Sequence, residues 1–319
     1  MTLKILQKWL PKSYNINKFI IKNNNNDIRG VYCKKDIKKG ELIIKINLKY
    51  LITIEKCKKN KIIIEYFDKL YKNISNNSLI ALFLLLESKN KKSIWTPYLK
   101  SLPKKNNHVL NMSNKQIQEF KGTTLLNKYH ESNYYDYKKK ILTDYNLINK
   151  YIKCSLKKFK YYRSLVGSRI FSLNNYNEFN LNGLVPFCDL LNHNSNNYNT
   201  KWIFNTSNKY FELKSTTFIP KNTELLDSYG DNKSNTLLML YYGFTIPNNY
   251  NNNYIPILYK KSIIKLSPTT ILHINDTVLQ KKCSKLVKTL KCKTSNINVN
   301  NIKESNLYIL QKLLKSIYN

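Results

Sequence analysis

The order of apolar patterns along the chain constrains its fold more than any single residue. The chain opens with three short β-favouring runs separated by turn signals, at residues 19–21, 31–33 and 42–46. From Ser78 the apolar residues recur at helical spacing, and a helical pattern also covers residues 113–172. Strand-like runs return after Asn182. Strands therefore flank a helical segment, which predicts an α+β fold with a helical insert.

Helices are also expected in the C-terminal part of the chain and at its start. A short helix is expected from Thr236 to Tyr242, with Gly243 as the residue just past its end. Beyond an Asn-rich loop, residues 258–319 alternate apolar and basic residues around a final helix at residues 307–317, which predicts a small separate lobe. The basic residues 1–12 form either an amphipathic opening helix, which we favour, or a weak targeting peptide.

The formal net charge of +35 comes from 54 Lys and Arg against 19 Asp and Glu. Such an excess attracts nucleic acid, acidic proteins or anionic membranes. However, Lys, Asn, Ile and Tyr all have A/T-rich codons, so a genomic base bias explains their shared abundance without any function. Lys is also spread along the whole chain, and Arg, which reads phosphates and base edges better, is rare. Nucleic acid is therefore not expected as a specific partner.

Several classes of protein are disfavoured by missing patterns. The longest apolar run, residues 79–86, is shorter than the roughly 20 residues that span a bilayer. The six cysteines show neither a C-x-x-C pair nor zinc-finger spacing to a His, so we expect no metal site. The sequence contains no G-x-x-x-x-G-K, G-x-G-x-x-G or H-E-x-x-H motif. We expect a monomeric intracellular protein of the cytoplasm or nucleus, with reduced thiols and no membrane partner.

Four short polar segments lie beside apolar strand residues and are candidates for chemistry: residues 27–30, 168–169, 189–193 and 227–230. Asp189 and Asn192 could fix the tautomer of His193 or bind a ligand with it, but His193 could equally be structural. Asp189 with Asp227 could form a carboxylate pair, and Cys188 with His193 a nucleophile and its base. The residues alone leave these alternatives open.

Taken together and in order, these segments resemble the SET-domain methyltransferases of the Rubisco large-subunit methyltransferase class. The segments that carry the resemblance are D-I-R-G-V-Y-C-K-K-D-I-K-K-G-E (27–41), S-I-W-T-P-Y-L-K-S-L-P (93–103), G-T-T-L-L-N (122–127), S-R-I-F (168–171), V-P-F-C-D-L-L-N-H (185–193), E-L-L-D-S-Y-G (224–230), K-S-N (233–235) and Y-G-F (242–244). Two of these segments, which match G-T-x-L-L (122–127) and S-R-x-F (168–171), are typical of the insert-bearing subclass.

The resemblance implies a SET-domain β fold of small antiparallel sheets with a pseudoknot-like core. The SET domain would cover residues 1–247, with a helical insert at about residues 55–165. Residues 248–319 would form a short helical C-terminal lobe, a reduced version of the substrate-binding domain of the class.

The resemblance also implies S-adenosylmethionine (SAM) as the cofactor, with a lysine side chain of a protein as the methyl acceptor. Tyr229 would be the catalytic tyrosine. The implied cofactor-binding residues are Asp27, Arg29, Gly30, Arg169, Asp189, Asn192, His193 and Tyr242. By this resemblance, the backbone of Asp27, Arg29 and Gly30 would line the methionine end of SAM, and Arg169, the arginine of S-R-x-F, would face its carboxylate. The N-H pair holds the adenine side, the aspartate supports that loop, and the tyrosine of Y-G-F packs on the cofactor.

The chain departs from the class at two places. Ile28 stands where the class has the first glycine of G-x-G, and the C-terminal lobe is much shorter. Both departures suit an alternative, a SET-like binding or scaffold protein without catalysis. A histidine acceptor is a second alternative, but Ile170 stands where the histidine-specific relative carries a polar Asn, which favours lysine. The identity of the target protein stays open.

Overall fold

The computed structural model describes residues 2–23, 28–173, 182–250, 254–259, 261–267, 277–292 and 294–318. The chain forms two compact units. The first consists of residues 1–104 and 144–231, and the second of residues 105–143 and 232–319. These units reflect packing within the chain, whereas the domain limit at residue 247 concerns the extent of the SET domain and stays a prediction.

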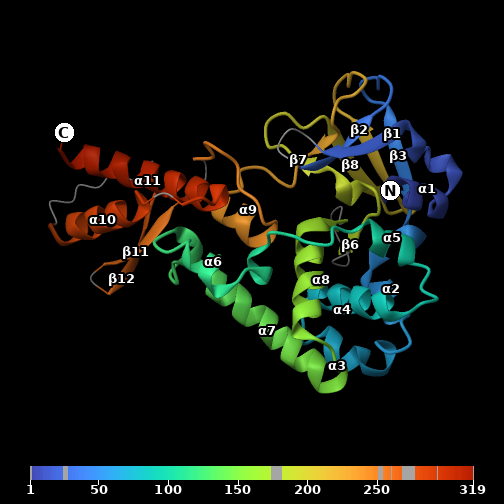
Figure 1. Ribbon diagram of the computed structural model, residues 1–319, viewed down its shortest axis with the longest axis horizontal. Helices are drawn as coiled ribbons and strands as arrows, with labels where there is room; N and C mark the ends of the chain where they lie inside the picture. Colours follow the sequence, from blue (N-terminus) through green and yellow to red (C-terminus); the bar gives the residue numbers. More distant parts are fainter. Residues whose placement is uncertain are drawn as a thin grey trace. The chain divides into compact units, whose positions relative to one another are not determined.

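The first unit contains small β-sheets, as predicted (Figure 1). The antiparallel sheets are β1 (Phe19–Asn23) with β2 (Arg29–Cys33); β3 (Leu42–Asn47) with β9 (Tyr210–Ser215) and β8 (Thr200–Asn205); and β4 (Ile52–Thr53) with β6 (Asn182–Leu184) and β5 (Ile170–Ser172). One pair, β7 (Asn192–His193) with β10 (Leu226–Asp227), is parallel. Each of the larger sheets joins strands from before and after the helical segment, so the β part of this unit is assembled from both ends of the sequence.

The helices of the first unit include one that is long and buried. They are α1 (Thr2–Trp9), α2 (Ile54–Lys58), α3 (Phe67–Tyr71), α4 (Asn76–Lys89), α5 (Thr96–Ser101) and α8 (Leu156–Arg169). Residues 78–86 of α4 are all buried, and α4 packs along α8. The side chain of Ser75 caps α4 by accepting a hydrogen bond from the main-chain N–H of Ser78. The carboxylate of Asp144 accepts hydrogen bonds from both serine hydroxyls and thereby anchors this helix start.

The opening segment is a helix, as favoured from the sequence. Leu6 of α1 is fully buried, and Leu10 lies just beyond the helix in the same hydrophobic core. That core also contains Val31 of β2, Ile46 of β3 and Phe211 of β9. Burial of each such side chain contributes about 1.5–3 kcal/mol to folding, so α1 is an integral part of the first unit.

The second unit contains more structure than the sequence predicted. Its elements are α6 (Asn114–Gln118), the first part of α7 (Tyr134–Tyr151), α9 (Asn235–Tyr241), β11 (Ile255–Tyr259), β12 (Ser262–Leu266), α10 (Thr277–Leu290) and α11 (Ile297–Tyr318). The β11–β12 hairpin and α10 were not predicted, and α11 begins at Ile297 instead of residue 307. Leu279, Cys283 and Leu290 of α10 are buried against Ile309 and Leu310 of α11. Lysines between these apolar residues obscured the helical period in the sequence.

The end of α9 matches the prediction. Tyr242 is the C-cap residue of α9, and Gly243 has the left-handed conformation with φ of 82°. The N–H of Gly243 donates a hydrogen bond to the carbonyl of Leu238, 3.0 Å away. A Cβ at Gly243 would lie 3.1 Å from the backbone of His108, whereas Gly40, with φ of 79°, has no atom within 4 Å of its Cβ position. The two glycines therefore share a backbone requirement and differ in space.

We expect Gly243→Ala to lower the free energy of unfolding by more than Gly40→Ala. Each substitution places a Cβ in the left-handed region, which costs on the order of 1 kcal/mol, and only the first also pushes against a neighbouring backbone. Urea unfolding of the two variants beside the wild type measures the difference. Equal losses would show that the segment at His108 yields without cost.

Candidate active site

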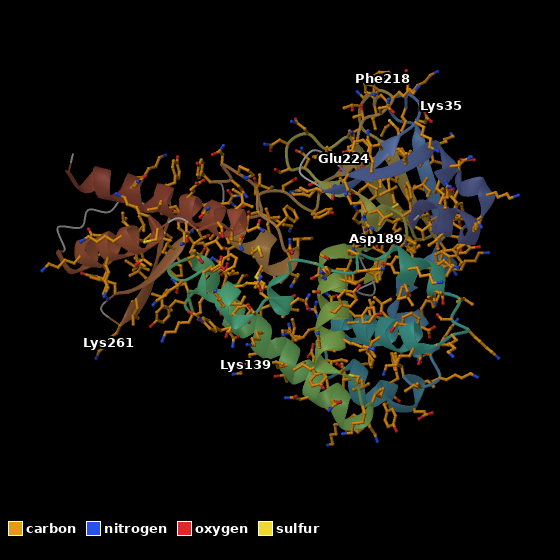
Figure 2. The ribbon with its side chains drawn as sticks, viewed as in Figure 1. Lys35, Lys139, Asp189, Phe218, Glu224 and Lys261 are labelled. Atoms are coloured by element: carbon orange, nitrogen blue, oxygen red, sulfur yellow. The ribbon has the colours of Figure 1, made fainter. Side chains whose placement is uncertain are left out.

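The predicted site residues of the first unit lie at the ends of short strands and helices. Arg29 and Gly30 begin β2, Arg169 ends α8, and Asp189 lies in a 3-10 turn at Cys188–Leu190. Asn192 and His193 form β7, and Tyr229 follows β10. Asp27 lies outside the described residues. Figure 2 labels Asp189 and Glu224, the two carboxylates around which these residues are arranged.

A hydrogen-bond cluster around Glu224 orients Asn192. The amide nitrogen of Asn192 donates to Glu224 Oε1 at 2.7 Å and to the main-chain carbonyl of Arg29 at 2.9 Å. The Tyr32 hydroxyl donates to Glu224 Oε2 at 3.1 Å. A Cβ on Gly30 would lie 2.1 Å from Glu224 Oε1. Glycine at this position therefore makes room for the carboxylate that holds Asn192.

Glu224 was not among the predicted site residues. Its position at the start of the E-L-L-D-S-Y-G segment is the one signal in the sequence, and an isolated bridge pairs it with Tyr32. The side chain of Ile28, which replaces a glycine of the class, is 50 % exposed. The hydrogen bonds of Asn192 to Glu224 and to Arg29 form with isoleucine at this position.

A second cluster surrounds the buried carboxylate of Asp189. The hydroxyl of Tyr98, in α5, donates to Asp189 Oδ2 at 2.7 Å, and Nη1 of Arg169 lies 3.9 Å from the same oxygen. Arg169 Nη1 also donates to the main-chain carbonyl of Asp189. Burial raises the pKa of Asp189, and the positive charge of Arg169 opposes this shift. The carboxylate thus joins α5 and α8 to the turn that precedes Asn192.

Positive charge exceeds negative charge in this second cluster. Nη1 of Arg29 donates to the carbonyl of Ser101 at 3.2 Å, and burial together with the charge of Arg169 lowers the pKa of Arg29. Two guanidinium groups therefore lie near one carboxylate, that of Asp189. Among the described residues, the buried Nε of Arg169 has no hydrogen-bond acceptor. This arrangement is suited to binding a further anionic group.

The aromatic rings of Tyr229 and His193 are stacked, with centroids 5.1 Å apart. The main-chain N–H of Tyr229 donates to Nδ1 of His193 at 3.1 Å, which makes Nδ1 the acceptor nitrogen of the ring. The Tyr229 hydroxyl donates to the carbonyl of Leu191 at 2.6 Å. Stacking and two hydrogen bonds thereby fix the orientation of Tyr229.

The two alternative chemistries from the sequence find little support. Burial raises the pKa of the Cys188 thiol well above its usual value, and the nearby charges of Asp189 and Asp227 add to this shift. A thiol held protonated in this way is a poor nucleophile. Asp189 is paired with Arg169, so it does not share a proton with Asp227 as a carboxylate dyad would.

Tyr242 belongs to the second unit and is described within it. It ends α9, its ring centroid lies 6.2 Å from that of Phe244, and burial raises the pKa of its hydroxyl. Across the described ranges, no group of three or more His, Cys, Asp or Glu side chains could hold a metal ion. In the same part of the chain, every helix is too short or too polar to cross a membrane.

Replacing Tyr98 by Phe should destabilise the first unit. The substitution removes the hydroxyl that donates to Asp189, whose Oδ1 already has no hydrogen-bond partner among the described residues. An unsatisfied buried carboxylate costs about 1–3 kcal/mol or more. Tyr145→Phe is the control, since its hydroxyl donates to the neutral carbonyl of Cys154. A loss in urea unfolding no greater than that of the control would contradict a structural role for the Tyr98 hydroxyl.

Asp227 predicts a specific dependence of stability on pH. Burial raises its pKa from 3.8 to about 7, while the N–H of Ser228, which donates to its carboxylate at 2.9 Å, opposes the shift. The folded protein therefore keeps a proton that the unfolded chain loses, so stability is present at low pH and is lost as pH rises through about 7.

We expect the wild type to lose roughly 3 kcal/mol relative to Asp227→Asn between about pH 5 and about pH 8. Urea unfolding of both proteins across this range measures the difference. The exposed Asp68 is the matched control, because Asp68→Asn should follow the wild type. Parallel pH profiles for the wild type and Asp227→Asn would show that Asp227 has an ordinary pKa.

Comparisons with known proteins identify the family of the chain. The family model described as "SET domain" matches residues 28–230. A lysine N-methyltransferase of fructose-bisphosphate aldolase from Arabidopsis thaliana, described as chloroplastic, is 28 % identical over 242 residues, which is 70 % of this chain and 48 % of the relative. The Rubisco large-subunit N-methyltransferase of Nicotiana tabacum, also described as chloroplastic, is 28 % identical over 235 residues, 68 % of this chain and 45 % of the relative.

The fold also matches a solved structure. The crystal structure of the SET domain of LSMT bound to lysine and AdoHcy superposes with a TM-score of 0.74 at 17 % identity, covering 98 % of this chain and 90 % of that one. The chain spans about half the length of the two curated relatives above. The family model covers more than half of the chain, and the chain therefore belongs to the SET-domain family.

Proposed function

We propose that this protein is a SAM-dependent methyltransferase that transfers a methyl group to a lysine side chain of another protein. Family membership supports a methyltransferase, and the two relatives described above are both named as N-methyltransferases, the first of them for lysine. The observation that carries the proposal is the fixed orientation of the Tyr229 hydroxyl, which donates to the carbonyl of Leu191. Tyr229 lies two residues after Asp227, which pairs with His193, and the hydrogen-bonded Asn192 directly follows Leu191.

The residues of the first unit fit the polar groups of SAM. Its carboxylate would complement the two guanidinium groups of Arg29 and Arg169, for which the described residues provide Asp189 as a nearby counter-charge. Asn192 and His193 would hold the adenine side, and Gly30 would leave the backbone open for close approach. When bound, SAM supplies a methyl group on a positively charged sulfur.

Tyr229 would position the reacting groups and would not exchange protons. Its hydroxyl donates its proton to the carbonyl of Leu191, so toward a polarised methyl group the oxygen would act as an acceptor of weak C–H···O contacts. The stacked ring of His193 and the bond to its Nδ1 keep the tyrosine in one orientation. Methyl transfer needs nucleophile, carbon and sulfur in line, so a rigid site accelerates it mainly by orientation.

A lysine acceptor must lose its proton before it can react. Burial disfavours the ammonium form, and nearby positive charge has the same effect. The positively charged sulfur of bound SAM would therefore favour the neutral amine of an entering lysine. Ile170, apolar beside Arg169, gives no hydrogen bond through its side chain to a histidine ring, which is why lysine is favoured over histidine as the acceptor.

The alternative of a SET-like scaffold protein without catalysis predicts that no methyl group is transferred. It rested on Ile28 and on the short C-terminal lobe. Ile28 is half exposed, and Asn192 donates its hydrogen bond to Glu224 in its presence. We propose that the cofactor site is functional despite the substitution. A protein partner as substrate follows from the proposed reaction, while a monomeric state and an intracellular location remain proposals from composition.

We expect Tyr229→Phe to reduce methyl transfer by at least about 100-fold while the protein still binds SAM. The substitution keeps the ring that stacks on His193 and removes only the hydroxyl. Transfer is measured with labelled SAM on a proteome extract and binding by calorimetry, with Tyr145→Phe as the matched control.

Mass spectrometry of the labelled peptides identifies the acceptor. Methyl-lysine that depends on Tyr229 is the expected result, and methyl-histidine without methyl-lysine would overturn the acceptor assignment. Binding of SAM without any transfer by the wild type would instead favour the scaffold alternative.

A further inference from the structure

A cavity of about 300 Å³ opens in the first unit, lined by a different set of residues from the clusters around Asp189 and Glu224. Its walls come from the turn at Leu48–Tyr50, from α2 and from the β8–β9 loop. Five of its eight lining residues are charged, namely Lys49, Lys56, Lys59, Lys209 and the acidic Glu55, although most of the surface facing the cavity is apolar.

The positive charge of the cavity is not compensated within the part of the chain that the structure describes. None of its four lysine ammonium groups forms an ion pair there, although Lys49 lies over the ring of Tyr50 at 5.2 Å. Burial lowers the pKa of Lys56, and the neighbouring charge of Lys59 lowers it further. Like charges gathered in this way repel one another, although Lys49, Lys59 and Lys209 are exposed and solvent screens part of the repulsion. A bound anion would relieve this repulsion.

The backbone holds two of the lysines in place at the cavity. The N–H of Leu48 donates to the carbonyl of Lys209 at 2.9 Å, next to the register pair of Asn47 with Tyr210. Lys209 itself has a φ of 59°, a conformation in which glycine is favoured. The side-chain oxygen of Asn47, another lining residue, accepts from the N–H of Lys49 at 3.0 Å. The charged rim is thus built on a hydrogen-bonded frame.

We propose that this cavity binds a small anion with two or more phosphoryl groups, either inorganic or carried by a nucleotide. Its volume is at the lower end of small-molecule sites. Lysines act as mobile point charges that suit phosphoryl oxygens, and the cavity has no arginine for a planar, bidentate contact. The side chain of Leu48 and the lysine stems provide an apolar floor for an uncharged part of the ligand.

Binding of sodium tripolyphosphate to the full chain, measured by calorimetry, tests the site. The double variant Lys56→Gln with Lys209→Gln should weaken binding at least about tenfold. The control double variant Lys35→Gln with Lys139→Gln has the same net charge and changes two exposed lysines, labelled in Figure 2, which should leave binding unchanged. Equal weakening in the two double variants, or no binding by the wild type, would overturn the proposal, because only the general surface charge would then act.

Thermal unfolding gives an independent readout. Tripolyphosphate should raise the melting temperature of the wild type and of the control variant by a few degrees and that of the cavity variant by much less. Tighter binding of ATP than of tripolyphosphate, lost in Leu48→Ala, would identify a nucleotide, and equal binding would identify inorganic phosphates. Cavity-dependent binding of an acidic peptide in place of tripolyphosphate would refute the phosphate assignment. None of these measurements requires SAM, so they do not depend on the proposed methyl transfer.

Discussion

The candidate site depends on the contacts of one buried carboxylate, that of Asp189, with Tyr98 and Arg169. It accepts the Tyr98 hydroxyl and lies beside Arg169, so one side chain connects α5, α8 and the turn before Asn192. A buried charge is tolerated only when it is paired and hydrogen-bonded. Its partners come from segments far apart in the sequence, which means that the site exists only once the helical segment has folded against the strands.

A second carboxylate, Glu224, completes the frame. It holds Asn192 through a hydrogen bond that the absence of a side chain on Gly30 makes possible, and the parallel β7–β10 pair brings the next segment, with Tyr229, beside His193. The positions of the cofactor-binding candidates and of the catalytic candidate therefore depend on the same short strands. This is consistent with a reaction that relies on alignment more than on proton transfer.

The sequence predicted features that depend on local patterns. These include the first strands, the buried helix from Ser78, the end of α9 at Gly243 and the polar segments of the site. It did not predict Tyr98 or Glu224 as members of the site, because each acts through a partner 91 or 32 residues away. The parallel pairing of β7 with β10 was missed for the same reason, and α10 was missed because its apolar face is interrupted by lysines.

The most direct test of the proposed cofactor site compares the binding of SAM with that of decarboxylated SAM by calorimetry. If Arg29 and Arg169 bind the carboxylate of SAM, the decarboxylated compound should bind at least about tenfold more weakly, as expected for the loss of a charge-assisted contact. Equal affinities would contradict this assignment and would show that Arg29 and Arg169 have another role.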